Sequence, residues 1–305
     1  MDRPTEDAEE SFLNQSSKTR GASKHARPSV HAVPAPRSRS SRTVLITAIA
    51  VGSIVLFCCA FSTCARFLAG SGSGSSQPEY TSPYNWNCLS SANGRYSYIV
   101  DGVSRSKTGI DVSSNQQAID WPSVAGNGVD FAFIRLGYRG TTEGGIYLDD
   151  FYTQNIAEAE AAGVSCGVYF FSQATTEDEA REEADFVIAN LAGAKLAYPV
   201  AFDSETVSGQ AGRTDGLDKS SMTAIANAFC SEIAKAGYST TVYGNTQDMA
   251  RYDISALSSN NIWYAAYDQL PTARFDFSIW QYSNSGSVAG ISTPVDMDID
   301  LSGAL

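Results

Sequence analysis

The sequence predicts an α/β domain in which parallel strands close into a TIM-like barrel. Short apolar, strand-like runs alternate with helix-like segments over about 200 residues, which is typical of βα units. Eight such strands occur in one stretch, and this number favours a closed barrel over an open sheet. No G-x-G-x-x-G or P-loop motif follows any strand, which argues against a nucleotide-binding sheet.

Three regions are expected before the barrel. Residues 1–42 are rich in Ser, Arg and Pro and predict a disordered tail. Residues 43–66 contain an uncharged apolar stretch long enough to cross a bilayer as a helix. Residues 67–107 begin with a Gly/Ser-rich linker and continue as an extended arm that includes a strand-like run at 95–100. The barrel domain is expected over 108–305.

The charges around the apolar stretch predict its orientation. Arg37, Arg39 and Arg42 lie just before it, and Arg66 alone follows closely. The positive-inside rule therefore places the N-terminus in the cytoplasm and the barrel domain outside the cell membrane. We expect an uncleaved single-pass anchor, because no clean cleavage site is present; a cleaved signal peptide and a secreted protein are the alternative.

The strands and helices of the barrel can be placed along the chain. Strands are expected at 108–113, 131–138, 166–171, 198–205, 240–245, 261–267, 277–283 and 295–300. Helices are expected at 148–163, 175–193 and 219–237, each ending on a glycine that tolerates the left-handed conformation after a helix. The connections after residue 245 are shorter and less helical.

Charge and residue content exclude several classes of function. From Lys107 onward the chain has 26 acidic and 10 basic residues, so this part would repel nucleic acid. Both histidines, His25 and His31, lie in the tail, which excludes His-dependent nucleophilic catalysis and His-ligated zinc in the barrel. None of the six cysteines has C-x-x-C spacing, and a disulfide among Cys88, Cys166 and Cys230 stays open. We expect no metal and no cofactor.

Carboxylates stand at the ends of three predicted strands. Asp203 and Glu205 follow the fourth strand, Asp111 ends the first, and Asp296 lies in the last. Active sites of TIM-like barrels lie at the carboxyl ends of the strands, so these acids should meet at one mouth. Because residues i and i+2 of a strand share a face, Asp203 and Glu205 stand side by side. Crowding of like charges would raise one pKa, as a general acid requires.

Aromatic residues near the ends of the other strands suit a carbohydrate-binding cleft. Sugar rings stack on aromatic faces while their hydroxyl groups meet carboxylates. The candidates for substrate contact are Tyr138, Tyr169, Phe171, Tyr243, Trp263, Tyr267 and Trp280.

Other acids have a simpler explanation. Glu177, Asp178, Glu179, Glu182 and Glu183 are interpreted as the solvated face of the helix at 175–193. Asp111 could cap a helix near Gln116, and a lone Asp-x-Glu pair is a weak signal by itself. What favours a catalytic role is that acids occur at three strand ends of a barrel without histidine.

Several motifs together resemble the glycoside hydrolase family 25 lysozymes. They are "GIDVSSNQQAIDWPSVAGNGVDFAFIRLGYRG", "GVYFFSQA", "YPVAFDSE", "IWYAAY", "IWQYS" and "PVDMDID", in this order from about residue 108 to the C-terminus. The resemblance implies an irregular (β/α)5β3 barrel, which agrees with the strand count. Phe170 and Asn115 stand where members often carry histidine, so substrate affinity or pH optimum would differ.

The resemblance also implies an activity and residue roles. Members cleave the β-1,4 bond between N-acetylmuramic acid and N-acetylglucosamine in peptidoglycan. By motif position Glu205 would be the general acid, and Asp203 would orient the substrate N-acetyl group in substrate-assisted catalysis. Asp111 and Asp296 would complete the acidic floor, and Tyr169, Trp263, Tyr267 and Trp280 would contact sugar.

The leading hypothesis is a membrane-anchored peptidoglycan hydrolase. The alternative of another class is a non-catalytic peptidoglycan-binding module that kept the fold. All four acids are present, which argues against that alternative. A chitinase-like glycosidase is less favoured, because the D-x-x-D-x-D-x-E signature is absent and Pro199 stands four positions before Asp203. The sequence leaves the oligomeric state open.

Overall fold

The computed structural model describes residues 80–207, 209, 211–259 and 261–305. The predicted tail at 1–42, the predicted membrane anchor at 43–66 and the Gly/Ser-rich part of the linker lie outside these residues. Within the described ranges, no helix has the length and hydropathy needed to cross a membrane.

A small antiparallel sheet precedes the barrel, where the sequence analysis expected an extended arm. It consists of β1 (Leu89–Ala92), β2 (Arg95–Val100) and β3 (Val103–Ser104). Two-residue turns join these strands, Asn93-Gly94 and Asp101-Gly102, and all four turn residues have positive φ between 51° and 79°. Asn-Gly and Asp-Gly adopt this conformation at low cost, and the resulting turns match the twist of the paired strands.

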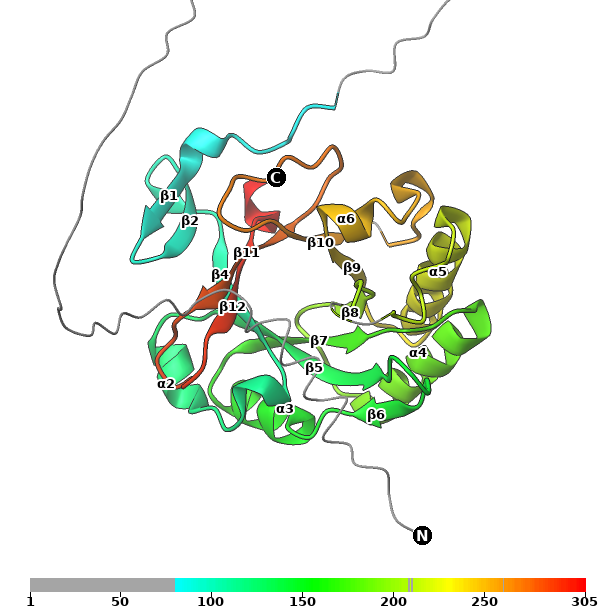
Figure 1. The fold of residues 1–305 in the computed structure, drawn as a ribbon. Coiled ribbons are helices and arrows are strands. Elements are labelled where there is room, and N and C mark those ends of the chain that lie inside the picture. The colour runs from blue at the N-terminus through cyan, green and yellow to red at the C-terminus, as the bar shows by residue number, and fades with distance from the viewer. Residues whose placement is uncertain (1–79, 208, 210, 260) are drawn as a thin grey trace, which may run out of the picture. The chain divides into compact units, whose positions relative to one another are not determined.

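Eight strands close into a mixed barrel, shown in Figure 1. Seven run parallel: β4 (Lys107–Val112), β5 (Phe131–Arg139), β7 (Ser165–Phe171), β8 (Val200–Asp203), β9 (Thr240–Asn245), β10 (Ile262–Ala265) and β11 (Ile279–Gly286). The eighth, β12 (Val295–Asp300), is antiparallel to both of its neighbours, β11 and β4. Pairing of β4 with β5 closes the barrel, and β6 (Ile146–Leu148) adds a hairpin to β5. The prediction of an all-parallel barrel is therefore wrong for the last strand.

A helix follows each of the first five barrel strands. They are α2 (Trp121–Gly126), α3 (Tyr152–Ala161), α4 (Glu177–Leu191), α5 (Lys219–Lys235) and α6 (Thr246–Met249). The three predicted helices are confirmed; each ends two residues earlier than predicted, and α3 and α4 also start later. Thr176 and Asp218 cap α4 and α5 by accepting hydrogen bonds from Glu179 N and Ser221 N.

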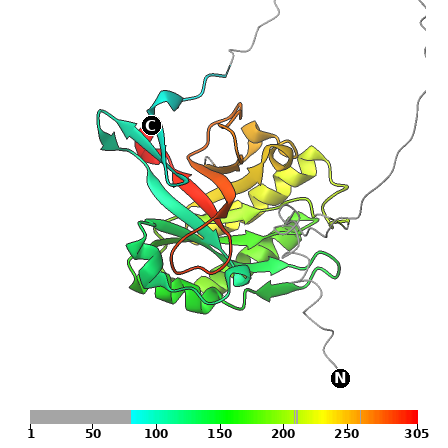
Figure 2. The same ribbon diagram turned by 60° about the vertical axis from the view of Figure 1, so that its left-hand side comes forward.

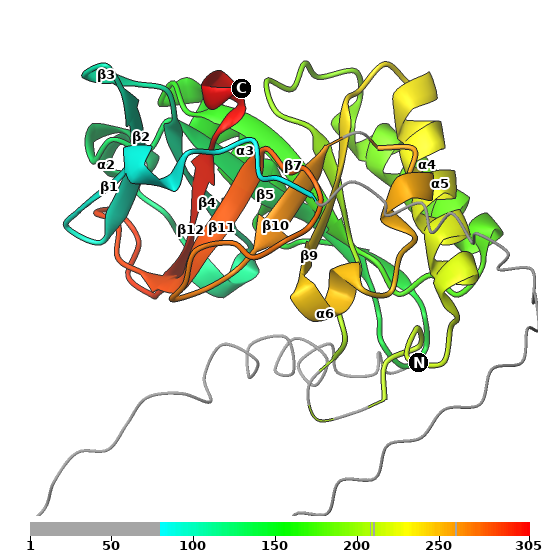
Figure 3. The same ribbon diagram turned by 90° about the horizontal axis from the view of Figure 1, so that it is seen from above.

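The outer face of the barrel is covered by two different kinds of structure. In Figure 3, α4 and α5 lie on one side of the strands, and the β1–β3 sheet lies on the opposite side, beside β4 and β12. Figure 2 shows the same neighbourhood of β2, β4 and β12 from another angle. Tyr96 of β2 stacks on Trp280 of β11 with ring centroids 5.2 Å apart, and Trp86 meets the same indole edge-on at 5.8 Å. The small sheet thus covers β11 and β12, which no α-helix follows within the described residues, together with the adjoining β4.

Aromatic rings fill the interior of the barrel. Phe131 stacks on Tyr198, and Phe133 stacks on Trp263, each with centroids 4.3 Å apart. Two glycines make room for these rings. A Cβ atom on Gly109 would lie 2.1 Å from the ring of Phe131, and one on Gly167 would lie 2.8 Å from the ring of Phe133. The interior below the mouth is therefore a packed floor.

The three cysteines of the described residues, Cys88, Cys166 and Cys230, are free thiols. Cys166 and Cys230 are buried, and burial raises the pKa of both thiols to about 12. They behave as small apolar side chains of the packing between strands and helices.

Candidate active site

The structure brings the four candidate acids to one end of the barrel. Asp111 lies near the carboxyl end of β4, and Asp203 is the last residue of β8, with Glu205 just beyond it. Asp296 reaches the same end because β12 is antiparallel: it lies at the start of that strand and pairs directly with Asp111. The charge of Asp296 acts on both Asp111 and Glu205.

Asp203 and Glu205 form a pair of carboxyl groups at the mouth. Asp203 is buried and Glu205 is partly exposed, and each affects the pKa of the other. Burial raises the pKa of Glu205 to about 8, with smaller contributions in the same direction from the charges of Asp248 and Asp296. Burial and the charge of Glu205 likewise raise the pKa of Asp203 well above its usual range. The pair therefore retains a proton near neutral pH, which is the condition for a general acid.

A further acid, Asp248 of α6, lies close to this pair and was missed by the sequence analysis. It is fully buried, and its carboxylate accepts hydrogen bonds from the backbone N–H groups of Asn245 (3.3 Å) and Thr206 (3.4 Å). Arg251 donates to the carbonyl oxygen of Ser204 at 3.2 Å. These contacts fix the backbone on both sides of Glu205.

The side-chain amide of Gln281 holds the carboxyl group of Asp111 in place. Gln281 of β11 donates from Nε2 to Asp111 Oδ2 at 2.6 Å. The same amide accepts at Oε1 from the hydroxyl groups of Tyr243 (2.8 Å) and Tyr267 (2.5 Å). The amide therefore directs its NH₂ group toward Asp111 and its Oε1 toward the two tyrosine hydroxyl groups.

Arg135 is the cation of this region, and the sequence analysis did not single it out. It is buried in β5 and bonds Asp149 through Nε at 2.8 Å and NH2 at 2.7 Å, while NH2 also donates to Ser114 Oγ at 2.8 Å. Its guanidinium lies 5.3 Å from the ring centroid of Tyr138. The charge of Arg135 lowers the pKa of Asp203, against the effect of burial. The sequence did hold a signal for this residue: it is a lone arginine in the apolar run "FAFIRLGY", on the same face of the strand as Phe131 and Phe133.

The candidate aromatic residues differ in how far they are exposed at the mouth. Tyr138, Tyr169 and Tyr267 are partly exposed, and Tyr243, which is buried, bonds the same amide as Tyr267. Phe171 is buried and pairs in register with Asp203. Burial raises the pKa of Tyr169, Tyr243 and Tyr267 well above the usual range, so their hydroxyl groups stay protonated.

The two tryptophans differ from the sequence expectation. Trp263 is 1% exposed and lies in the barrel floor, where its Nε1 donates to Asp298 Oδ1 at 2.8 Å. Trp280 is also 1% exposed, but it points outward, packs against Tyr96 and donates to the carbonyl oxygen of Ala266. Neither ring offers a free face, because alternate residues of neighbouring strands pack into the floor and under the β1–β3 sheet.

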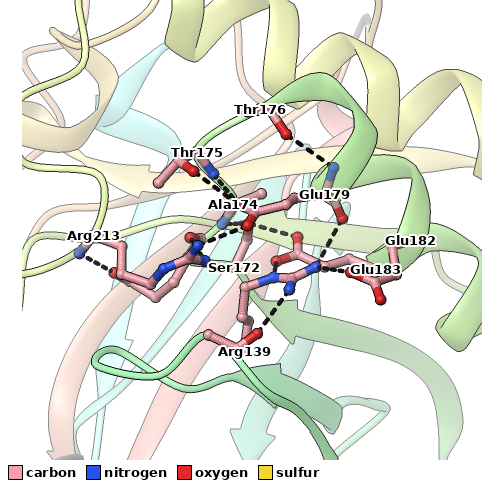
Figure 4. A network of polar contacts seen from close by, with 11 residues as sticks. Arg139, Ser172, Ala174, Thr175, Thr176, Glu179, Glu182, Glu183 and Arg213 are labelled. Carbon is pink, nitrogen blue, oxygen red and sulfur yellow. Dashed lines mark hydrogen bonds and ion pairs between the residues drawn. The ribbon is translucent and has the colours of Figure 1, made fainter.

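A buried polar network supports the ends of β7 and β8, as Figure 4 shows. Ser172 donates its backbone N–H to the carbonyl oxygen of Asp203 at 2.6 Å, and its hydroxyl to Glu183 Oε2 at 2.6 Å. Arg139 donates from Nε to Glu183 Oε1 at 2.7 Å and from NH2 to Glu182 at 2.8 Å. Arg213, in the segment after Glu205, pairs with Glu179 at 2.7 Å.

These contacts correct the interpretation of the α4 acids as a solvated face. Glu183 is fully buried, and Glu179 is paired with Arg213, which helps to lower the pKa of Glu179 to about 2. Glu177 and Asp178 do lie at the surface, where both contact Arg181. Within the described ranges, no group of three or more His, Cys, Asp or Glu residues is arranged to hold a metal ion.

Comparisons with known proteins show which family this chain resembles. The family model described as "Glycosyl hydrolases family 25" matches residues 110–291. The autolytic lysozyme of Clostridium acetobutylicum is 29% identical over 191 residues, covering 62% of this chain and 54% of that protein. Lysozyme M1 of Streptomyces globisporus is 29% identical over 199 residues, covering 62% of this chain and 65% of that protein. The chain therefore spans less than two thirds of the length of these relatives.

Solved structures show the same architecture. The bacterial lysozyme of Streptomyces coelicolor is 28% identical with a TM-score of 0.53, covering 63% of this chain and 90% of that one. The modular autolysin LytC of Streptococcus pneumoniae, at 24% identity and a TM-score of 0.56, covers 69% of this chain and 51% of its own length, and supports the fold alone. The family match extends over more than half of the chain, from β4 to the segment before β12, and so this protein belongs to the family 25 glycosyl hydrolases.

Proposed function

We propose that this protein is a lysozyme of the muramidase type, which hydrolyses the β-1,4 bond between N-acetylmuramic acid and N-acetylglucosamine in peptidoglycan. The observation that carries the proposal is the Asp203–Glu205 pair at the end of β8, where burial raises the pKa of a partly exposed Glu205 to about 8. Family membership and the names of the two lysozyme relatives support the same activity.

In this proposal the two carboxyl groups have different roles in catalysis. Glu205 is the exposed member of the pair and donates its proton to the leaving glycosidic oxygen. Asp203 is more deeply buried, and its Oδ1 has no hydrogen-bond donor among the described residues. An N-acetyl group of the substrate would supply the missing N–H, and Asp203 would then orient its carbonyl oxygen toward the anomeric carbon. Adjacent carboxylates suit this substrate-assisted route better than direct attack by the enzyme.

The remaining residues of the mouth have supporting roles. Burial keeps the proton on Glu205, and the charges of Asp248 and Asp296 help, because a neighbouring negative charge disfavours ionisation. Tyr138, Tyr169 and Tyr267 are the partly exposed aromatic side chains suited to contact sugar rings and hydroxyl groups. A peptidoglycan-binding module without activity is disfavoured, because binding alone does not require a coupled carboxyl pair that holds a proton.

The bond that is cleaved can be identified by mass spectrometry of the products. The full-length protein should release fragments from purified peptidoglycan, and borohydride reduction should label their reducing ends. A muramidase leaves N-acetylmuramic acid at each reducing end, whereas a glucosaminidase leaves N-acetylglucosamine. Reduced glucosamine ends would contradict the proposed specificity, and the absence of any new reducing ends would contradict a hydrolase.

We also propose that the protein is anchored in the cell membrane by residues 43–66, with the barrel domain outside. The support is the uncharged sequence of this segment and the arginines before it, since the segment lies outside the described residues. Trypsin added to intact cells should cleave the barrel domain from the anchor, with exposed sites such as Arg105 available. A domain that is protected until the cells are permeabilised would contradict this topology, and one recovered in the medium would indicate secretion.

A further inference from the structure

Asp298 is a buried acid for which the proposed mechanism has no role. It lies in the middle of β12 with no exposed surface, one layer below the mouth, and pairs in register with Gly109, which has no side chain. Its Oδ1 accepts from Trp263 Nε1 at 2.8 Å. Its Oδ2 has no donor among the described residues, and Asp111 lies diagonally across from it on the same face of the β4–β12 pair.

Two charged carboxylates at such neighbouring buried positions repel each other, and a proton on one of them removes this repulsion. Asp111 is 7% exposed and Asp298 is 0% exposed, so both are removed from water. Arg135, the buried arginine of this site, is already paired with Asp149. Two buried negative charges side by side without a cation are strongly unfavourable, and the pair is expected to retain one proton between them.

The surroundings determine which carboxyl group holds the proton. The indole N–H of Trp263 stabilises a negative charge on Asp298. Asp296 pairs directly with Asp111 and its charge opposes ionisation there. The Gln281 amide favours a charge on Asp111, but it is one neutral donor against a nearby carboxylate. Asp111 is therefore the better site for the proton.

The other titratable groups around the pair do not change this balance. They are Asp296 on β12, Arg135 on β5, Tyr169 on β7, Tyr243 on β9 and Tyr267 after β10. The three tyrosines stay neutral because burial raises their pKa values well above the usual range. Burial also raises the pKa values of Asp111 and Asp298 well above theirs, which agrees with a shared proton.

We propose that Asp298 is a positioning residue of the catalytic site: its carboxylate accepts a hydrogen bond from the protonated carboxyl group of Asp111, which keeps Asp111 neutral at the mouth and places the negative charge one layer deeper. The role of this pair in catalysis rests on the proposed function. Asp296 then faces a neutral neighbour and ionises at a lower pH than it would beside a charged Asp111. An ionised Asp296 would also position substrate or water at the mouth, and the position of the charge inside the floor thus sets the acidic limit of activity.

Asp298→Asn tests this inference, with Asp300→Asn as the matched control. Asparagine keeps the acceptor for Trp263 and presents an N–H to Asp111, so Asp111 should lose its proton. A charged Asp111 raises the pKa of Asp296, and the acidic limb of the kcat–pH profile should move to higher pH by about one unit. Asp300 lies on the same face of β12, two residues deeper, where it bonds Tyr198, and its replacement should leave that limb in place.

An infrared measurement on the full-length protein tests the proton without relying on activity. Asp298→Asn should lose part of the C=O stretching band of protonated carboxyl groups at mildly acidic pH, and Asp111→Asn should lose the same component. Asp300→Asn should retain it. If Asp298→Asn does not fold, the Asp111→Asn spectrum decides alone, because an unchanged band there means that no proton is shared.

The outcomes separate this inference from the proposed function. A wild-type protein that does not cleave peptidoglycan would contradict the function, while the infrared spectra would still decide whether Asp111 and Asp298 share a proton. An active wild type whose acidic limb is unmoved in Asp298→Asn, or moved equally in Asp300→Asn, would overturn the role of Asp298 and leave the function intact.

Discussion

Glu205→Gln is expected to lower the rate of reducing-end release from peptidoglycan by about 10²- to 10⁴-fold, the usual contribution of a general acid. Glutamine has the shape of glutamic acid but no acidic proton, so the leaving oxygen would depart as an unfavourable anion. The effect should appear in kcat, because proton donation acts in the transition state and contributes little to ground-state binding. The measurement is steady-state kinetics on purified, solubilised peptidoglycan.

The substitution should leave the fold intact. Glu205 is partly exposed and already holds a proton near neutral pH, so a neutral amide replaces a largely neutral acid. Glu158→Gln is a suitable control, since Glu158 is exposed on α3 and contacts only Gln154 among the described residues. Turnover like that of the wild type in Glu205→Gln, at an unchanged melting temperature, would refute the role of Glu205 as the acid.

The strands and the candidate acids were accessible from the sequence for a physical reason. Buried strands of an α/β barrel are continuous apolar runs, and a carboxylate at the end of such a run is conspicuous. Asp111, Asp203 and Glu205 follow this rule, and the structure places all three at one end of the barrel. Hydrophobic periodicity also identified α3, α4 and α5.

The direction of the last strand was not accessible in this way. Alternation in "VDMDID" shows which residues share a face, but it is the same whichever way the strand runs. In a parallel strand, Asp300 would lie at the mouth and Asp296 at the closed end. Because β12 is antiparallel, Asp296 pairs with Asp111 at the mouth, and Asp300 bonds Tyr198 at the closed end. The strand-end argument that selected Asp296 assumed a parallel strand, and Asp296 reaches the mouth only because β12 is antiparallel.

Contacts between distant segments account for the other differences. Asn93-Gly94 and Asp101-Gly102 were recognisable hairpin turns, but nothing local indicated that β2 would cover Trp280. The acids of α4 likewise form one charged run. Their separation into surface residues and the buried Glu183 depends on Arg139, which is 44 residues away in the sequence.

Arg139→Met is expected to destabilise the barrel domain by about 3–5 kcal/mol, the usual effect of removing one partner from a buried ion pair. Arg139 and Glu183 have side chains that are 4% and 0% exposed, and Glu183 would remain without its counter-ion. Methionine fills most of the volume, so the loss would come from charge and hydrogen bonds and not from a cavity. For a domain of this size the melting temperature should fall by about 10 °C, measurable by calorimetry of the full-length protein.

The pH dependence gives this prediction a second, independent check. Burial raises the pKa of Glu183 to about 7 even with Arg139 present, and without the arginine the pKa should rise further. A carboxyl group with a raised folded-state pKa favours the folded state at low pH, and this stabilisation is lost as pH rises through that value. The deficit of Arg139→Met should therefore be larger at pH values above about 7 than in mild acid. Arg181→Met is the control: Arg181 is 41% exposed and pairs with exposed acids of the same helix, so its loss should change the stability far less than the loss of Arg139. Equal effects of the two substitutions would mean that the buried network contributes no more than a surface pair, and that Ser172 holds the end of β8 without it.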